Sequence, residues 1–456
     1  MKPTADVVIC GAGIAGISAA HELAVRHGIS DVLVVDERPP LSLTSDKSTE
    51  AYRNWWPGPD DAMVRLMNRS IDLLEELSTT CENRFLLNRR GYLYATGDSE
   101  RAEAYRTAGR RAEAMGAGAL RIHTGSPDDP LYVRHKPLGW HGQPEGADLI
   151  LDQTLLRQTF PYLTDSVAAA LHTRRCGWFS GLQLGMELLE RARAAGARFL
   201  EGRVEEVVHG DGRVSCVRVA KHGETSTVST PCFVNAAGPF LRPVAALLGV
   251  ELPVFSELHL KVSFDDHLAV VPRDAPLLIW DDPQRVQWAE EERELLSSDP
   301  DTRWLVEELP AGVHMRPEGR SHILILWPYH CRPAPESFPI EIPDEFSELC
   351  LRGMTTLVPG LSVYLDRIPK PWIDGGYYTK VRDNRPLAGP LPVDGAFVHG
   401  ALSGFGLMAS CATAELVALH LTGDTLPEYA AAFGLERFED TEYVARVESW
   451  GDLGQL

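Results

Sequence analysis

The sequence predicts an α/β protein with two domains: a Rossmann-like dinucleotide-binding domain and a substrate domain on a mixed, mainly antiparallel sheet. Three observations support this prediction. An apolar run at residues 5–10 leads into a G-x-G-x-x-G turn, and the central segments contain short runs with strand-like alternation. The length of 456 residues also exceeds the size at which a single hydrophobic core stops growing.

The glycine turn has the spacing of a phosphate-binding loop. Gly11 permits a tight turn, Gly13 allows a pyrophosphate to approach the backbone, and Gly16 lets the next helix pack on the strand. The helix expected from Ile14 to about His27 directs its first N–H groups at the phosphates. Asp36 ends a second apolar strand, where a carboxylate binds a ribose hydroxyl. These features predict dinucleotide binding, and a βαβ unit without a nucleotide is the alternative.

The composition is typical of a soluble globular protein, with 44% hydrophobic and 24% charged residues. The formal net charge of −20 argues against nucleic acid or an anionic membrane as the main partner. The eight cysteines form no C-x-x-C pair and show no zinc-like spacing, so we expect reduced thiols, no metal and a cytoplasmic protein. We also expect no export leader and no apolar run long enough to span a membrane.

Further elements extend the nucleotide-binding domain beyond its first unit. We expect helices at residues 60–77 and 182–195, a strand at 198–207, a hairpin turn at Asp211-Gly212 and a short strand at 233–235. A strand at 396–400, a small-residue turn at 401–406 and a helix at 407–421 follow near the end of the chain. The chain therefore returns to the first domain after excursions.

The intervening segments predict the second domain. Strands are expected at residues 258–264, 277–280 and 322–327, with helices at 290–296 and 344–351 and surface loops at 316–320 and 333–343. We therefore assign residues 1–89, 164–252 and 375–456 to the dinucleotide-binding domain, and residues 90–163 and 253–374 to the substrate domain.

Three separated segments carry a more specific pattern. They are the first βαβ unit with the loop Thr44–Thr49, the pair 202–207 and 235–238, and the C-terminal stretches 376–390 and 400–408. The combination resembles flavoproteins of the D-amino-acid-oxidase type, a group that includes sarcosine oxidases, glycine oxidase and dimethylglycine dehydrogenases. The resemblance implies a glutathione-reductase-type FAD-binding domain and a cofactor that is FAD and not NAD.

The resemblance also implies which residues hold FAD. They are Gly11, Gly13, Ile14, Ala15, Gly16, Asp36, Glu37, Ser45, Ser48, Thr49, Val204, Ala237, Gly238, Ser403, Gly404, Phe405, Gly406, Leu407 and Met408. The turn at 403–406 precedes an apolar helix, whose N-terminus suits the flavin edge that collects negative charge on reduction; a merely tight turn is the alternative. Gly376 replaces the cysteine of covalent sarcosine oxidases, and residues 48–49 lack the attachment histidine of dimethylglycine dehydrogenases. We therefore expect FAD without a covalent bond.

Two substrate contacts follow from the same resemblance. Arg53 follows the flavin-facing loop where sarcosine oxidases place a carboxylate-binding arginine, and a guanidinium suits that bidentate role. A surface arginine stacked beside Trp55 or Trp56 is the alternative. Tyr378 resembles the family's active-site tyrosine, with a buried sheet tyrosine as its alternative.

Three further residues are candidates for the catalytic site. His330 stands where sarcosine oxidases carry a substrate-pocket histidine, which near neutral pH helps to hold the amine as its free base. His259 and Lys261 alternate on one strand face towards the expected pocket. For His330, the alternative is a structural histidine whose ring nitrogens are hydrogen-bonded within the protein. For Lys261, the alternative is a solvated lysine at the edge of the sheet.

Departures from the family widen the substrate range. Met408 replaces a second carboxylate-binding cation, and the strand 323–326 lacks the lysine that promotes reaction with oxygen in sarcosine oxidases. We expect oxidation of the C–N bond of an amine, an N-substituted amino acid, to an imine by hydride transfer to flavin N5. Dioxygen or another acceptor takes the electrons, and the protein is a monomer or homodimer. There are three alternatives: an FAD monooxygenase, a disulfide reductase and a non-catalytic FAD-binding protein. The G-D motif of FAD monooxygenases is missing at residues 392–396.

Overall fold

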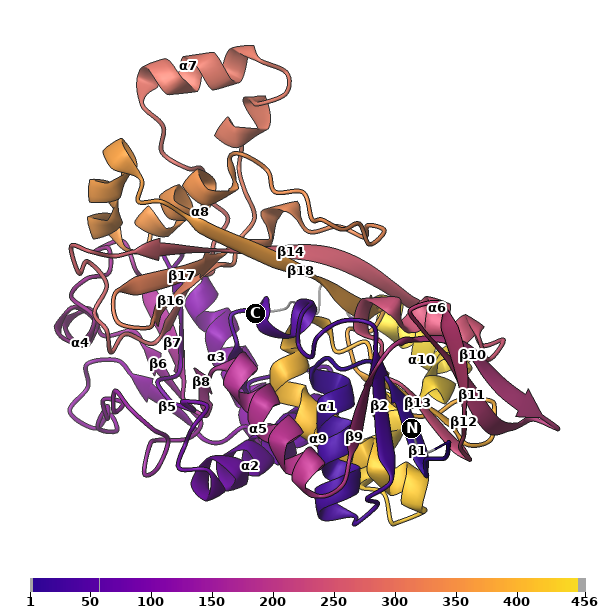
Figure 1. Cartoon of the computed structure of the whole chain (residues 1–456). Helices are drawn as coiled ribbons and strands as arrows, with labels where there is room; N and C mark the ends of the chain where they lie inside the picture. The colour runs from indigo at the N-terminus through magenta and orange to yellow at the C-terminus, as the bar shows by residue number, and fades with distance from the viewer. Residues whose placement is uncertain (1–2, 57, 450–456) are drawn as a thin grey trace.

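The computed structural model describes residues 3–56 and 58–449, arranged around two large sheets (Figure 1). The first sheet contains, in order, β19 (Leu387–Pro390), β20 (Ala396–Gly400), β13 (Cys232–Asn235), β1 (Val7–Cys10), β2 (Val32–Asp36) and β9 (Arg198–Glu201). All neighbours are parallel except β19 and β20. Strands from both chain ends therefore share one sheet, as the sequence predicted.

Side chains of the central strand alternate between two covers. Val7 and Ile9 of β1 pack with α1 (Ile14–His21), α2 (Ala62–Thr80), α5 (Gly181–Ala194) and α9 (Gly406–Thr422). Val8 and Cys10 pack against a three-stranded sheet of β10 (Arg203–Gly210), β11 (Arg213–Lys221) and β12 (Glu224–Ser229), with α6 (Leu241–Ala246) beside it. The parallel sheet is thus buried on both faces, which explains its continuous apolar strands.

The second sheet has nine strands and is mixed but mainly antiparallel. Its order is β18 (Trp372–Val381), β14 (Val254–Asp265), β17 (His322–Leu326), β16 (Val313–Glu318), β15 (Leu277–Trp280), β4 (Tyr92–Thr96), β7 (Ala169–Thr173), β6 (Ala147–Ile150) and β5 (Leu120–His123). Among its described pairs, β15 with β4 and β5 with β6 are parallel. The predicted sheet type is confirmed. The domain boundaries stay a prediction. They assign β7 and most of β18, two strands of this sheet, to the dinucleotide-binding domain.

Further helices complete the molecule. They are α3 (Arg101–Ala114), α4 (Gln153–Thr159), α7 (Glu290–Ser298), α8 (Phe346–Thr355) and α10 (Thr441–Ser449). Figure 1 shows α7 and α8 beyond the nine-stranded sheet, away from α1 and α9. Phe346 and Leu349 of α8 share a core cluster with Ile323 and Ile325 of β17. The opposite face of this sheet is therefore turned towards the nucleotide-binding side.

Most predicted elements are confirmed, with small shifts of their ends. The helices predicted at 60–77, 182–195 and 407–421 are α2, α5 and α9. The hairpin turn joins β10 to β11, and both Asp211 and Gly212 have positive φ angles of 51° and 77°. The predicted helix at 14–27 ends as α1 at His21 and continues as a π-helical turn, Glu22–Arg26.

The strand predicted at residues 198–207 is wrong, because it breaks at Gly202. The Gly202 N–H donates to the carbonyl of Asp36 at 2.8 Å, and a Cβ at this position would lie 2.7 Å from a methyl carbon of Val219. The chain therefore leaves the parallel sheet after β9 and enters the three-stranded sheet as β10. Tertiary packing, and not strand propensity, decides this break.

The surface loop predicted at residues 316–320 is also wrong at its start. Arg316 lies on β16 and is 2% exposed. Its Nε donates to the carbonyl of Thr49 at 2.7 Å and its Nη2 faces the Glu50 carboxylate at 3.2 Å. An arginine on a strand is buried here because partners from a distant loop reach it.

By length and composition alone, one described helix is long and apolar enough to cross a membrane. From the sequence we expected no apolar segment of that length. The helix covers Ser403–Thr422, and 67% of the window lies buried within the fold. Its apolar surface packs against α1 and α2, so the hydrophobicity of this segment is explained by its position in the protein core.

Candidate functional site

A cleft of about 730 Å³ opens at the carboxyl ends of β1, β2 and β20 and extends along β18. Its volume lies within the range of about 300–1,000 Å³ that is usual for ligand and cofactor sites. Segments from the two ends of the chain line it together, because the topology brings β1 and β20 to either side of β13. Its position is the crevice where open α/β sheets bind ligands.

Two glycines of the first turn are required by close packing. Gly11 has φ of +112°, and a Cβ on it would lie 2.3 Å from the carbonyl oxygen of Ala236. A Cβ on Gly16 would lie 1.9 Å from the carbonyl oxygen of Gly11. Only glycine fits at either position, so the backbone of this turn lies bare at the cleft.

The N-terminus of α1 faces the cleft. Gly13, Ile14 and Ala15 line it, and the Ile14 N–H donates to Ser45 Oγ at 2.9 Å. The loop that carries Ser45 therefore lies directly over the start of the helix. An N-terminus exposed in this way attracts phosphate through its N–H groups and its dipole.

Asp36 is held in a fixed orientation at the end of β2. Its Oδ2 accepts from the Ala12 N–H at 2.7 Å, and its Oδ1 accepts from the Arg38 N–H at 2.9 Å. Each carboxylate oxygen keeps a further lone pair for a donor in the cleft. A ribose hydroxyl is such a donor, so the group fits the predicted role.

Most residues predicted to bind the cofactor line the cleft. They are Gly11, Gly13, Ile14, Ala15, Asp36, Glu37, Ser45, Ser48, Val204, Ala237, Gly238, Ser403, Gly404, Gly406 and Leu407. Gly16, Thr49, Phe405 and Met408 lie outside this lining: Gly16 serves packing, and the ring of Phe405 meets the edge of Trp56 at 5.2 Å.

Several lining residues were not anticipated from the sequence. They are chiefly Arg38, Leu41, Phe240, Pro243 and Tyr377. Arg38 lies over the ring of Phe240 at 5.4 Å and over that of Phe338 at 5.8 Å. Tyr377 lies in the stretch 376–390 that carries the family pattern, whereas no motif marks the other four; the position of Arg38 two residues after Asp36 is a usable signal.

Comparison with known proteins agrees with this geometry. The family model described as DAO, FAD dependent oxidoreductase, matches residues 6–419. The chain belongs to this family. The protein is therefore an FAD-dependent oxidoreductase. The bare turn, the exposed helix N-terminus and the fixed carboxylate have the chemistry expected of groups that hold FAD. No curated protein matches the sequence.

Solved structures show the same fold at low sequence identity. L-proline dehydrogenase from P. horikoshii superposes with a TM-score of 0.72 at 19% identity, covering 96% of this chain and 99% of that one. Glycine oxidase from Geobacillus kaustophilus gives 0.69 at 18%, with coverages of 94% and 98%. Iminodiacetate oxidase from Chelativorans sp. BNC1 gives 0.68 at 18%, with coverages of 94% and 98%.

The cleft lining supports FAD without a covalent bond. Among the described residues that line it there is no histidine, and its one cysteine, Cys10, lies at the end of β1 beside the phosphate-binding turn. Burial raises the pKa of the Cys10 thiol to about 12, which keeps it protonated and a poor nucleophile.

Arg53, the predicted substrate contact, lies outside the lining of the cleft, on β3 (Ala51–Arg53), and is 2% exposed. Its Nη1 donates to the hydroxyl of Tyr94 at 3.0 Å, and its guanidinium lies 4.4 Å from the ring centre of Trp56. Nε is buried without a hydrogen-bond partner, and within residues 3–56 and 58–449 no carboxylate pairs with this side chain. Arg53 therefore stacks on Trp56, as the alternative interpretation expected, but it is buried and is not a surface arginine.

Tyr378 and His259 form a stacked pair beside the cleft. Their ring centres lie 4.1 Å apart with an angle of 11° between the planes, and Tyr378 lines the cleft near Ser48. His259 Nδ1 lies 3.4 Å from Cys331 Sγ, and its Nε2 lies 3.3 Å from the Glu257 carboxylate. Both ring nitrogens of His259 are therefore engaged within the protein, and its contact with Tyr378 is through the ring face.

Lys261 supports the loop of residues 44–49. Its Nζ donates to the carbonyl of Asp46 and approaches that of Ser48 at 3.5 Å. Burial lowers the pKa of Lys261, while the nearby carboxylate of Glu50 opposes this effect. The lysine thus holds the loop above the helix N-terminus and is not a freely solvated edge residue.

His330 lies on a 3₁₀ turn, Pro328–His330, directly after β17. Its ring meets the edges of Tyr329 at 5.0 Å and Phe346 at 5.4 Å. Both ring nitrogens are buried and have no hydrogen-bond partner within residues 3–56 and 58–449. Burial, with the nearby His259, lowers the pKa of His330 to about 4, so the ring is neutral at physiological pH.

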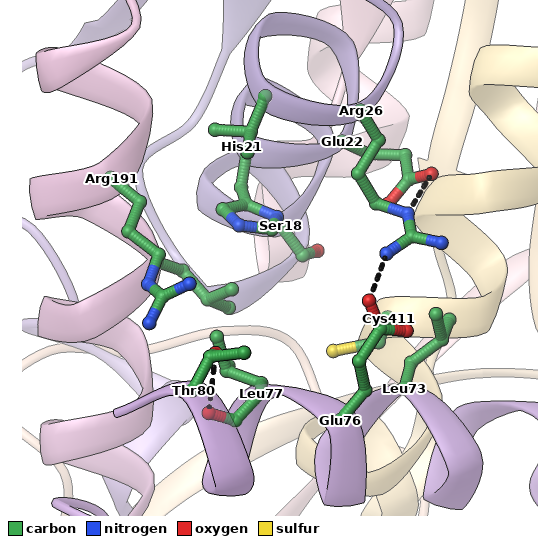
Figure 2. Close-up of a pocket in the computed structure, with 12 residues that line it drawn as sticks. Ser18, His21, Glu22, Arg26, Leu73, Glu76, Leu77, Thr80, Arg191 and Cys411 are labelled. Carbon is green, nitrogen blue, oxygen red and sulfur yellow. Dashed lines mark hydrogen bonds and ion pairs between the residues drawn. The ribbon is translucent and has the colours of Figure 1, made fainter. Parts of the chain in front are cut away.

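A second pocket lies among α1, α2, α5 and α9 (Figure 2). It measures about 120 Å³ and shares no lining residue with the cleft. Arg26 crosses it and pairs with Glu22 at 3.3 Å and Glu76 at 3.1 Å. It offers neither a bare glycine turn nor a helix N-terminus, so it does not belong to the cofactor site.

Proposed function

We propose that this FAD-dependent oxidoreductase oxidises the C–N bond of an amine that also carries a carboxylate, an N-substituted amino acid, to the imine, which water then hydrolyses. The observation that carries the proposal is Arg53, a buried guanidinium without a carboxylate partner in the described chain. A buried charge without a partner costs several kcal/mol, so such a group points to an anionic ligand.

The surroundings of Arg53 suit a small carboxylate. Tyr94 and Trp56 hold the guanidinium from two sides, which leaves its planar donor edge as the recognition element. Trp56 in turn contacts Phe405, in the turn before α9 that lines the cleft. This chain of contacts joins the carboxylate site to the cofactor site.

Bound FAD supplies the two-electron acceptor for the reaction. The residues of the chain orient and shield the substrate: Arg53 binds the carboxylate, and the ring of Tyr378, stacked on His259, forms a wall at the boundary with the cleft. Leu324 and Leu326 on the same sheet face exclude water from this region. No acid–base triad is needed for this chemistry.

The names of the structural neighbours support this substrate class. They are an L-proline dehydrogenase, a glycine oxidase and an iminodiacetate oxidase, and each named compound combines an amine with a carboxylate. We extend that class to the present chain on the strength of Arg53, and we leave the side chain of the substrate to experiment.

An anaerobic screen tests the proposal. The purified holoenzyme is mixed with N-methyl, cyclic and unsubstituted α-amino acids, and the flavin absorbance is followed; admission of air and peroxide detection then separate dioxygen from another acceptor. We expect bleaching by at least one secondary amino acid. Stoichiometric FAD that no amine reduces contradicts the proposal, and reduction by NADPH that an aromatic compound stimulates indicates a monooxygenase.

A further inference from the structure

One face of the nine-stranded sheet places His314 and Tyr94 in one row towards the proposed substrate site. On β16, Val313 and Met315 point into the core beneath α8, so His314 between them points to the opposite face. Across β17, β16, β15 and β4, the paired residues are Leu326, His314, Ile279 and Tyr94. These four residues form one row across the sheet, which we call the inner row.

The inner row places His314 close to the proposed carboxylate site. Tyr94 accepts the hydrogen bond from Arg53 at 3.0 Å, and one strand separates Tyr94 from His314. Neighbouring strands lie about 4.8 Å apart, so the two backbone positions are about 10 Å apart and their side chains lean over the same space. Arg53 also lowers the pKa of His314, as expected for neighbours.

The tautomer of His314 follows from its one hydrogen bond. Nδ1 lies 2.9 Å from the carbonyl oxygen of Gly312, which can only accept, so Nδ1 carries the proton. Nε2 therefore presents a lone pair. Burial, opposed by the Gly312 carbonyl and reinforced by His259 and Arg53, lowers the pKa of His314 to about 4, so the ring stays neutral in the physiological range.

His314 differs from the other two histidines of this region in what its ring can reach. Both nitrogens of His259 are engaged within the protein, and both nitrogens of His330 are shut off from any accessible space. His314 is 6% exposed, and its Nε2 has no hydrogen-bond partner among the described residues. It is thus the imidazole with an acceptor left for a ligand.

We propose that Nε2 of His314 accepts a hydrogen bond from the N–H of the substrate amine and so selects primary and secondary amines over tertiary ones. This inference rests on the proposed function and deepens it. In an α-amino acid the nitrogen and the carboxylate carbon are bonded to the same carbon, so one small molecule meets His314 and Arg53 together. The lone pair of a neutral imidazole is the matching acceptor for a neutral amine.

The selection arises in the neutral amine, the form that gives up hydride. A neutral tertiary amine has no N–H, so it leaves Nε2 of His314 buried without a partner. Sites built to bond a donor reject analogues that lack it. We expect the rate constant of flavin reduction divided by the dissociation constant to be about 10–100-fold higher for an N-methyl amino acid than for its N,N-dimethyl counterpart.

The test compares this ratio in four forms of the holoenzyme: the natural protein, His314→Leu, His314→Gln and His172→Gln. His314→Leu removes the acceptor and brings the ratio close to one, mainly by slowing the N-methyl substrate. His314→Gln supplies an amide oxygen and keeps part of the ratio. His172 is a matched control, since it is buried in the same sheet with both ring nitrogens engaged, by Tyr132 and by the carbonyl of Arg90.

A second measurement reads the tautomer without turnover. Nitrogen-15 NMR of histidine-labelled protein, assigned with His314→Gln, is expected to show Nδ1 protonated and Nε2 bare, and to shift when an N-methyl amino acid is added anaerobically. A protonated Nε2, or equal ratios in natural protein and His314→Leu, overturns the inference and leaves the proposed function standing. A protein whose FAD no amine reduces overturns both.

Discussion

The cofactor end of this protein and its proposed substrate end, which contains Arg53 and Trp56 and is called the substrate end below, differ in how their polar groups are satisfied. At the cofactor end, both oxygens of Asp36 and the first N–H of α1 already have protein partners. At the substrate end, Nε of Arg53 and Nε1 of Trp56 are buried and have no partner in the part of the chain that the structure describes. The fold thus fixes Asp36 and the start of α1 before any ligand binds, while Arg53 and Trp56 keep donors that only a ligand meets.

The difference has an energetic consequence. Satisfied groups stabilise the folded chain before any ligand binds, whereas a buried unpaired donor costs about 1–3 kcal/mol. Damage at the cofactor end should therefore reduce cofactor binding and folding together. Removal of a polar group at the substrate end should lower activity and leave the ligand-free protein as stable as before or more so.

The largest effect is expected from Gly16→Ala. The added methyl group would lie 1.9 Å from the carbonyl oxygen of Gly11, so the turn and the start of α1 must move apart. We expect FAD affinity to fall by at least about 100-fold, a loss of roughly 3 kcal/mol, through misplaced phosphate-binding groups. FAD content after purification and fluorescence titration of the apoprotein measure this.

Gly210→Ala is the matched control, because nothing lies within 4 Å of a Cβ at that position and its φ is not in the left-handed region. We expect normal FAD content in this variant. A Gly16→Ala protein with full FAD occupancy would contradict the assignment of this turn to the pyrophosphate.

Arg53→Met comes next in size and separates the two ends. We expect kcat/KM to fall by about 30–100-fold, since one partner of a buried ion pair with the substrate is lost. FAD content should be unchanged and the melting temperature of the substrate-free enzyme equal or higher, because an unpaired buried charge has been removed. Steady-state kinetics test the expected kcat/KM, and calorimetry tests the expected melting temperature. If the variant loses FAD but its remaining holoenzyme has a normal kcat/KM, Arg53 belongs to the cofactor end and not to the substrate end.

The smallest effect concerns the second pocket, which belongs to neither end. Glu22 lines this pocket (Figure 2), and burial raises the pKa of its carboxyl group to about 7. The folded protein therefore keeps a proton on Glu22 up to a higher pH than the unfolded chain does. This contribution to stability is complete below the unfolded pKa of about 4.5 and is lost as the pH rises through 7.

Glu22→Gln should therefore stabilise the protein at pH 8 by about 1–3 kcal/mol and have little effect at pH 4.5. Urea unfolding of both proteins at the two pH values measures the difference. An equal effect at both values would mean that Glu22 ionises normally, and unchanged kinetics would show that this pocket is separate from the active site.

Local patterns predicted the cofactor end well because its contacts are local. Gly16 and Asp36 contact Gly11 and Ala12 of the same βαβ unit, where short-range geometry determines what each residue does. The prediction failed where a distant segment decided the outcome: Gly202 breaks a strand because Val219 packs against it, and Arg316 is buried because the loop at Thr49 supplies its partners.

The sequence by itself determined the class of fold, the family and the region that binds FAD, since glycine spacing and strand ends are properties of neighbouring residues. It also indicated Arg53 as a candidate substrate contact. It did not indicate that this arginine is buried without a counter-ion among the described residues. The tertiary structure alone decided that His314 shares a row with Tyr94, because strand order and register join residues more than 200 positions apart. No local pattern carries that information, since pairing between distant strands depends on the packing of the whole sheet.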